Sequence, residues 1–156
     1  MHLLILIEKN AIRVYSLKVD IRGMLTMRRE TDYAIHMLKY LEKNKTGFIS
    51  LRELSEQTGI SFLFLQKIAR KLRMNRLIKA GAGVAGGYCL NKPAKQISLK
   101  MIIEATEGAS AILPCLCERT KTRCKGSNKK CALRFKLTKM NKKISDILDK
   151  TKLTDM

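Results

Sequence analysis

Acidic residues are scarce in this sequence. Its 156 residues include 13 Asp and Glu against 32 Lys and Arg, which gives a formal net charge of +19. Solubility alone calls for a net charge of about 2 to 8 in a small domain, so an excess of this size indicates a polyanionic partner. We expect that partner to be nucleic acid, with an anionic membrane surface as the alternative.

Long hydrophobic runs are also missing. The apolar run from Leu3 to Ile7 is shorter than the roughly 7 to 15 apolar residues of a signal peptide and far shorter than the ~20 that span a bilayer. We therefore expect a cytoplasmic chain without membrane association. Residues 1–26 are interpreted as an N-terminal extension, which is a start-site extension if the natural product begins at Met24 or Met27.

Catalytic constellations are lacking as well. The sequence has no Ser-His-acid set, no phosphate-binding loop and no paired acid and base. These absences argue against hydrolysis and nucleotide chemistry, so we predict that the protein is not an enzyme.

The centre of the sequence has the pattern of a helix-turn-helix followed by a hairpin. Ser50 and Glu53 form a capping-box sequence, in which each side chain can satisfy an orphan backbone N–H at a helix start. Gly59 suits the end of that helix, and Ser61 suits the start of the next one. Two short apolar runs around the glycine-rich residues 81–87 then predict a two-stranded wing. The apolar stripe that we expect to face the core in the second helix is Phe62, Leu65, Ile68, Ala69 and Leu72.

The polar side of the second helix is cationic. From residue 57 to residue 103 there are nine Lys or Arg and no Asp or Glu. A helix pair with a glycine-rich turn is common in small helical domains, but a face of one sign gains affinity for a polyanion by releasing condensed counterions. Residues 27–108 are therefore predicted to be a winged helix-turn-helix domain that binds double-stranded DNA. The predicted DNA-contact residues are Ser61, Phe62, Leu63, Gln66, Lys67, Arg70, Lys71, Gly83, Gly86, Gly87 and Tyr88.

Further helices are predicted on both sides of this unit. Residues 30–44 carry an apolar stripe, and Ser98 and Gly108 suit the two ends of a later helix. Residues 132–156 are predicted to be a dimerisation helix and tail, because a lone helix would leave its narrow coiled-coil seam in water. Packing of this helix on its own domain is the alternative, whereas a dimer suits paired DNA half-sites about one turn, ~34 Å, apart. The seam consists of Leu133, Leu137, Met140, Ile144 and Ile147. The predicted fold class is thus mainly α with a small β wing and a long C-terminal helix.

Four of the five cysteines lie in residues 109–131, which show no helical or strand periodicity. Cys117, Cys124 and Cys131 are spaced by seven, and Cys115 precedes them. Without secretory features, such thiols indicate metal or redox chemistry and not disulfides. The spacing is too open for a zinc ribbon or a ferredoxin-type run, so an iron–sulfur cluster, a zinc ion and unligated redox thiols are all left open. The remaining cysteine, within a wing strand, is predicted to be a small buried hydrophobic residue: Cys89.

Several stretches of the chain occur together in one known family, in the same order. They are MRRETDYAIHML, LRELSEQTGISFLFLQKIARKLRMNRLIKA, AGGYCL, ISLKMIIEATEG and the spaced cysteines before a long helix. With these stretches the chain resembles the Rrf-two family of bacterial winged-helix regulators. The resemblance implies a homodimeric transcriptional regulator whose second motif helix enters the major groove while the wing follows the minor groove. It also implies that a two-iron or four-iron cluster in the cysteine segment controls DNA affinity in response to iron, redox state or nitric oxide.

The same resemblance implies a set of cluster ligands. Relatives that carry a cluster bind it through three cysteines, which correspond here to Cys117, Cys124 and Cys131, with Cys115 as an alternative first ligand. In the nitric-oxide-sensing member a carboxylate of the partner subunit's first helix is the fourth ligand, and on the shared Thr-Asp-x-Ala pattern that position is Asp32. Another member uses a histidine just after the third cysteine, but residues 132–134 here are Ala, Leu and Arg.

Two departures from the family pattern concern DNA recognition. The wing has Ala82 where a well-known member has an arginine, and the reading helix has Gln66 and Lys67 where that member has Glu-Gln. Gln can pair with adenine and Lys with guanine, so the preferred DNA site should differ. The competing hypotheses are a zinc-stapled or thiol-redox DNA binder without a cluster and a small iron–sulfur electron carrier.

Overall fold

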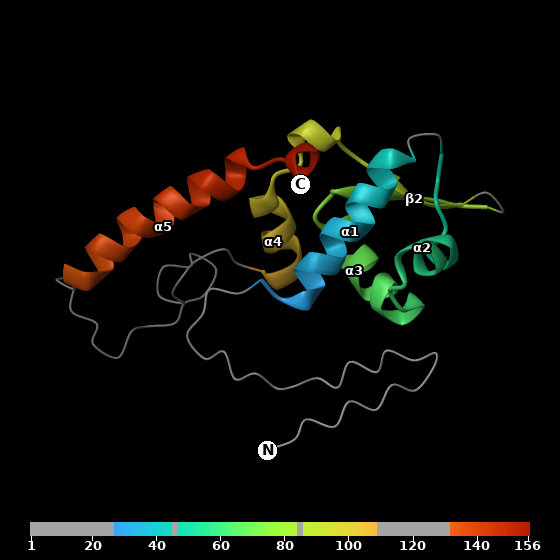
Figure 1. Cartoon of the computed structure of the whole chain (residues 1–156), viewed down its shortest axis with the longest axis horizontal. Helices are drawn as coiled ribbons and strands as arrows, with labels where there is room; N and C mark the ends of the chain where they lie inside the picture. The colour runs from blue at the N-terminus through green and yellow to red at the C-terminus, as the bar shows by residue number, and fades with distance from the viewer. Residues whose placement is uncertain (1–26, 45–46, 84–85, 109–131) are drawn as a thin grey trace, which may run out of the picture.

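The computed structural model describes residues 27–44, 47–83, 86–108 and 132–156. A reading head, as we call residues 27–108, is built from helices packed against one hairpin (Figure 1). A long helix extends away from it, and the C-terminal residues return to it. The elements in chain order are α1 (Arg29–Lys43), α2 (Leu51–Thr58), α3 (Phe62–Met74), β1 (Ile78–Gly81), β2 (Gly87–Leu90), η1 (Ala94–Gln96), α4 (Leu99–Glu107), α5 (Ala132–Lys150) and η3 (Leu153–Asp155). The predicted fold class, mainly α with a small β wing, is confirmed.

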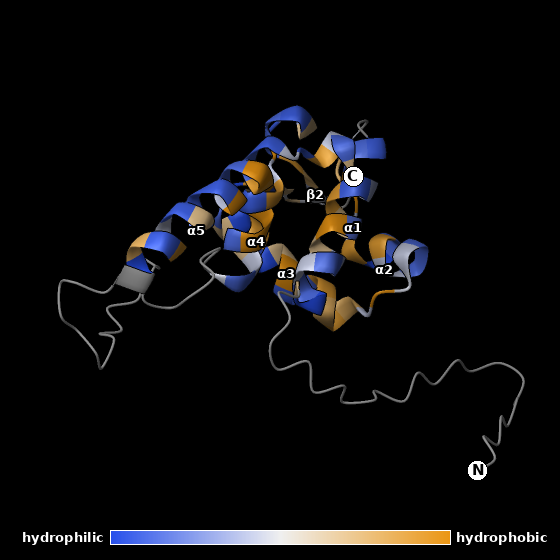
Figure 2. Cartoon of the chain, turned by 60° about the vertical axis from the view of Figure 1, so that its left-hand side comes forward, coloured by the Kyte–Doolittle hydropathy of each residue, from blue (hydrophilic) through white to orange (hydrophobic). Residues whose placement is uncertain are grey.

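One hydrophobic core joins the helices of the reading head to the first wing strand. Figure 2 shows the hydrophobic residues of α1, α3 and α4 gathered where these helices approach one another. Each fully buried Leu or Ile contributes roughly 1.5 to 3 kcal/mol relative to an exposed one. The largest side chains of this core include Met37, Leu38, Leu54, Leu65, Ile68, Leu72, Leu77, Ile78, Ile97, Ile102 and Leu153.

The helix boundaries follow the predicted capping signals, but not every predicted bond forms. Ser50 Oγ accepts a hydrogen bond from the Glu53 amide at 3.1 Å, and Gly59 ends α2 with a φ of +68°. The reciprocal half of the capping box is wrong, because the Glu53 carboxylate instead accepts a hydrogen bond from Tyr40 Oη at 3.3 Å. Ser61 precedes α3 as predicted, but its side chain makes no capping bond.

The predicted core stripe of α3 is too wide by one residue. Phe62, at the first position of the helix, is 42% exposed. The buried face consists of Leu65, Ile68, Ala69 and Leu72.

The wing is attached to the body by its second strand. β1 and β2 pair antiparallel, and Tyr88 exchanges backbone hydrogen bonds of 2.9 and 2.8 Å with Ile49. A Cβ atom on Gly87 would lie 2.3 Å from the Ile49 carbonyl oxygen, so only glycine permits this approach. The prediction of a buried Cys89 is wrong: its side chain is half-buried, because a two-stranded hairpin covers only part of its surface.

Helix α5 contacts the reading head through α4. Of the predicted seam, Leu137 and Ile144 are half-buried, whereas Met140 and Ile147 are 51% and 63% exposed. After α5 the chain packs back on the head: the Leu153 amide donates to the Ile97 carbonyl at 2.8 Å, and the Leu153 side chain is fully buried. The sequence did not predict this anchored tail. No helix in the described ranges combines the length and apolar character needed to cross a membrane.

Candidate nucleic-acid interface

The outward face of α3 contains most of the predicted DNA-contact residues. The buried stripe of α3 packs into the hydrophobic core, so the opposite face of the helix is exposed to solvent. Leu63, near the N-terminal end of α3, is 77% exposed. The exposed members of the predicted set on this side are Ser61, Phe62, Leu63, Gln66, Lys67 and Arg70. The arrangement presents apolar, amide and cationic groups together, the groups that contact thymine methyls, base edges and phosphates.

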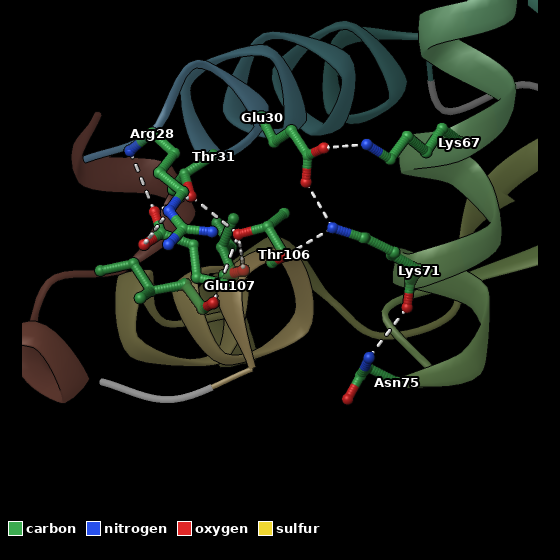
Figure 3. A network of polar contacts seen from close by, with 10 residues as sticks. Arg28, Glu30, Thr31, Lys67, Lys71, Asn75, Thr106 and Glu107 are labelled. Carbon is green, nitrogen blue, oxygen red and sulfur yellow. Dashed lines mark hydrogen bonds and ion pairs between the residues drawn. The ribbon is translucent and has the colours of Figure 1, made fainter. Parts of the chain in front are cut away.

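A carboxylate from α1 interrupts the cationic character of α3. Lys67 Nζ lies 2.5 Å from Glu30 Oε1, and Lys71 Nζ contacts the other carboxylate oxygen of Glu30 (Figure 3). The hydrogen bond from Lys67, followed by that from Lys71, lowers the pKa of Glu30 below its ordinary value. Residues 57–103 contain no acid, but the outward face of α3 is still not purely cationic, because the fold places the Glu30 carboxylate of α1 beside it. No local pattern in the sequence indicates this contact.

Lys71 differs from the other predicted contact residues of α3 because its side chain is directed inward. Its ammonium group donates to the Thr106 carbonyl at 2.6 Å as well as to Glu30, and its side chain is 32% exposed. Thr106 lies in the last turn of α4, where carbonyls lack helical partners. Lys71 thus joins α3 to the C-terminal end of α4.

Two aromatic residues pack in series beside Lys67. Its Nζ lies 5.9 Å from the ring centroid of Phe64, within cation–π range. The Phe64 ring in turn meets Tyr33 of α1 edge to face, with centroids 5.4 Å apart and an interplanar angle of 83°. Neither Phe64 nor Tyr33 is among the predicted DNA-contact residues, although both are large aromatic residues at helix positions.

The glycines of the wing have different roles. Gly83 is exposed with a φ of +99° and open space around its Cα, so it is free to approach a ligand. Gly86 and Gly87 are required for packing: a Cβ on Gly86 would lie 2.6 Å from the Gly81 carbonyl oxygen, and a Cβ on Gly87 would lie 2.3 Å from the Ile49 carbonyl oxygen. Tyr88 is half-buried beside the body. Residues 84–85 lie outside the described residues.

Of the predicted cluster ligands, the structure describes Asp32. Its side chain is 59% exposed on α1, and its carboxylate lies 3.6 Å from Nε2 of His36, one turn further on. The predicted ligands Cys115, Cys117, Cys124 and Cys131 lie outside the described residues. Within the described part of the chain, no three His, Cys, Asp or Glu side chains come together in a way that could hold a metal ion. The cysteine segment, residues 109–131, is joined to the end of α4 at Gly108 and to the start of α5.

Comparison with known proteins decides the family. The family model named Rrf2, described as an iron-dependent transcriptional regulator, matches residues 27–156. The chain belongs to the Rrf2 family. This Rrf2 protein is accordingly a DNA-binding transcriptional regulator and not an enzyme, as the sequence predicted.

Individual relatives within the curated proteins are distant. Protein aau3 of Rhizobium meliloti is 32% identical over 91 residues, which cover 58% of this chain and 59% of that protein, less than two thirds of its length. The regulator IscR of Pectobacterium carotovorum is 25% identical over 140 residues, covering 90% of this chain and 79% of IscR. Among solved structures, CymR, the global cysteine regulator of B. subtilis, superposes with a TM-score of 0.66 at 23% identity, over 85% of this chain and 95% of CymR. At that identity the likeness to CymR shows the fold alone.

Proposed function

We propose that this Rrf2 regulator reads a DNA operator with α3 and the wing, as a homodimer, and that an iron–sulfur cluster bound by its cysteine segment controls DNA affinity. The observation that carries the DNA-reading part is the exposed face of α3. Three of its polar side chains, Gln66, Lys67 and Arg70, are exposed on a helix whose other side is buried, with Lys67 paired to Glu30. Gln and Lys or Arg at such positions suit adenine and guanine edges in the major groove.

Dimerisation is supported by the apolar residues left exposed on α5. Met140 and Ile147 are seven residues apart and therefore lie on one face of the helix. Both are more than half exposed in the single chain, and exposed large apolar residues of one face are typical of a protein–protein contact. A second copy of α5 would cover them and would place two α3 helices for paired half-sites.

The chemistry of the donor set fits an iron–sulfur cluster. Three thiolates at Cys117, Cys124 and Cys131 are soft ligands, with Cys115 as the alternative first thiolate, and thiolates are the ligands that hold such clusters. Asp32 also fits as an additional ligand from the partner subunit. Its carboxylate is exposed and lies 3.6 Å from Nε2 of the neighbouring His36. When bound, a cluster would supply sensitivity to iron, oxidants or nitric oxide.

What the protein itself contributes is the connection between these donors and α3. The cysteine segment begins two residues after Glu107, whose carboxylate accepts hydrogen bonds from the Arg28 amide at 3.0 Å and the Thr31 hydroxyl at 2.6 Å. The start of α1, which carries Asp32, is thus bonded to the end of α4. A change in the order of the cysteine segment therefore acts on elements that are packed directly against α3.

The test is anaerobic purification followed by visible absorption spectroscopy and iron, sulfide and zinc analysis. We expect a coloured protein that contains iron and sulfide and loses both in Cys124→Ala. Cys89→Ala is the matched control, since Cys89 lies in β2, outside the segment, and this variant should keep the colour. A colourless protein with one zinc per chain contradicts cluster control and favours a zinc-stapled regulator. A protein with neither metal favours thiol redox control.

A further inference from the structure

The reading helix is restrained by α1 through the carboxylate of Glu30. Lys67 and Lys71 lie one turn apart on α3, and Figure 3 shows both side chains directed at Glu30. Glu30 precedes Lys71 by 41 residues, so the contact is tertiary and not a local helix pair. The Glu30 side chain is only 18% exposed, whereas Lys67 is 58% exposed. Lys67 is therefore accessible to an outside partner, while the carboxylate that holds it is largely enclosed.

The position of Glu30 is fixed by the residues around it. Thr31, the next residue, is completely buried, and its hydroxyl shares a 2.7 Å hydrogen bond with the Thr106 hydroxyl. The Thr31 hydroxyl also donates to Glu107 at 2.6 Å, which ties the first turn of α1 to the last turn of α4. The first turn of a helix often frays, but here it is bonded on its inner side. Glu30 is consequently held beside α3 by the fold.

An ammonium group cannot satisfy Glu30 and a DNA phosphate equally. A phosphate that approached Lys67 at its present position would also approach the Glu30 carboxylate, and like charges at short range repel. For Lys67 to bind DNA fully it must leave Glu30. Lys71 has the additional bond to the Thr106 carbonyl at 2.6 Å, so it is held on two sides.

We infer that Glu30 is a specificity-determining positioning residue of the reading head: it competes with DNA phosphate for Lys67 and so suppresses non-specific binding. This inference rests on the proposed role of α3 as the DNA-reading helix. Non-specific affinity depends on how many cations replace condensed counterions. While Lys67 is paired with Glu30, it is not one of the cations that replace counterions. A matched DNA site supplies base contacts, and their binding energy offsets the loss of the Lys67–Glu30 ion pair. Residues 57–103 contain no acid of their own to do this, so the restraint comes from α1.

The experiment compares Glu30→Gln with a matched control, Glu42→Gln. Both acids lie on α1, both side chains are 18% exposed and both pair with lysine, but Glu42 pairs with Lys39 and not with α3. Fluorescence anisotropy would measure binding to a random-sequence duplex of two helical turns, ~21 base pairs, and to the selected operator, over a series of salt concentrations.

We expect Glu30→Gln to bind the random duplex about 5-fold more tightly at 50 mM salt. One additional phosphate contact per subunit, or two per homodimer, should steepen the salt dependence by about 1.8 in log K against log salt, which multiplies the ratio of the Kd values at 200 and 50 mM by about 12. Operator affinity should rise less, so the specificity ratio should fall. Glu42→Gln should behave like the wild type. Equal behaviour of the two variants overturns the inference.

A second arm identifies the lysine and guards against loss of folding. In a Lys67→Gln background, Glu30→Gln should no longer change the salt slope, and an undiminished change there would show that Glu30 does not act through Lys67.

Should Glu30→Gln fail to fold, Glu30→Asp keeps the charge but is one methylene shorter. It should move random-duplex affinity in the same direction, and an unchanged affinity overturns the inference. If the wild type binds no duplex DNA, the proposed role of α3 fails; if it binds and the variants match the control, only the inference about Glu30 fails.

Discussion

The reading head and α5 are stabilised in different ways. In the head, α1 to α4 share one core of fully buried side chains, and even the polar start of α1 is bonded to α4. Helix α5 has 19 residues but contacts the head through α4, and Phe135, Met140 and Ile147 are 51% to 64% exposed. The head therefore contains its own stabilising contacts, whereas α5 exposes apolar surface that another chain can cover.

This difference separates two kinds of mutational effect. Substitutions in the core of the head should change the free energy of unfolding of each chain. Substitutions on the outward face of α5 should change assembly and, through assembly, operator binding.

The largest effect is expected for Leu72→Ala. Leu72 is fully buried in α3, so removal of its side chain should cost about 3 kcal/mol in the free energy of unfolding, measured by urea denaturation. Phe135→Ala removes a larger side chain from α5, but this ring is 64% exposed. Its removal should change the unfolding free energy of the head by less than about 0.5 kcal/mol. Similar costs for the two variants would contradict the comparison.

Next in size is the loss of the dimer. Met140→Asp combined with Ile147→Asp places charges on the exposed apolar face of α5, and we expect monomers in sedimentation experiments and operator affinity lowered about 100-fold. The unfolding free energy of the head should be almost unchanged. Lys142→Asp introduces the same carboxylate on an exposed position of the same helix and should leave the dimer intact. A double variant that remains dimeric would show that another surface joins the subunits.

The contrast between predicted and observed features follows the same division. Local signals predicted the helices of the head correctly, because capping residues such as Ser50 and glycines such as Gly59 act on their own segment. The exposed side of α3 was also predictable from periodicity. Contacts between distant segments were not: nothing near Glu30 indicates Lys67 and Lys71, and nothing in the last residues indicates the buried Leu153. Such contacts depend on the tertiary arrangement, which no sequence period encodes.

A smaller effect is expected from single substitutions that separate DNA binding by the head from cofactor binding by the cysteine segment. Lys67→Ala should weaken operator binding about 10-fold, since a good base contact is worth roughly 1 to 3 kcal/mol of discrimination, and should leave metal content unchanged. Cys124→Ala should remove the cofactor and leave the unfolding of the head largely intact. Metal analysis, anisotropy and urea denaturation of the same preparations would measure all three properties. If both variants damaged both properties equally, the two functions would not be separable.

The smallest effect concerns the pH dependence of the restraint on α3. The hydrogen bonds from Lys67 and Lys71 lower the pKa of Glu30 in the folded chain below its ordinary value, so its ionised form favours folding. This contribution is fully present above the unfolded pKa of ~4.3 and is lost as the pH falls through the lower, folded pKa. Wild type should exceed Glu30→Gln by about 1 kcal/mol in unfolding free energy at pH 7, and the difference should shrink below about pH 4. A difference that is independent of pH would show that the charge of Glu30 is not responsible.

The central claim is that the state of the cysteine segment controls how tightly the reading head binds its operator. The direct measurement is the operator Kd of one anaerobic preparation, before and after removal of its cofactor, at one fixed salt concentration. Coupling between sites typically changes affinity about 5- to 150-fold, and we predict a change within that range for the wild type and none for Cys124→Ala. An unchanged wild-type Kd would contradict the account and would leave an Rrf2 regulator whose DNA binding is independent of its cysteines.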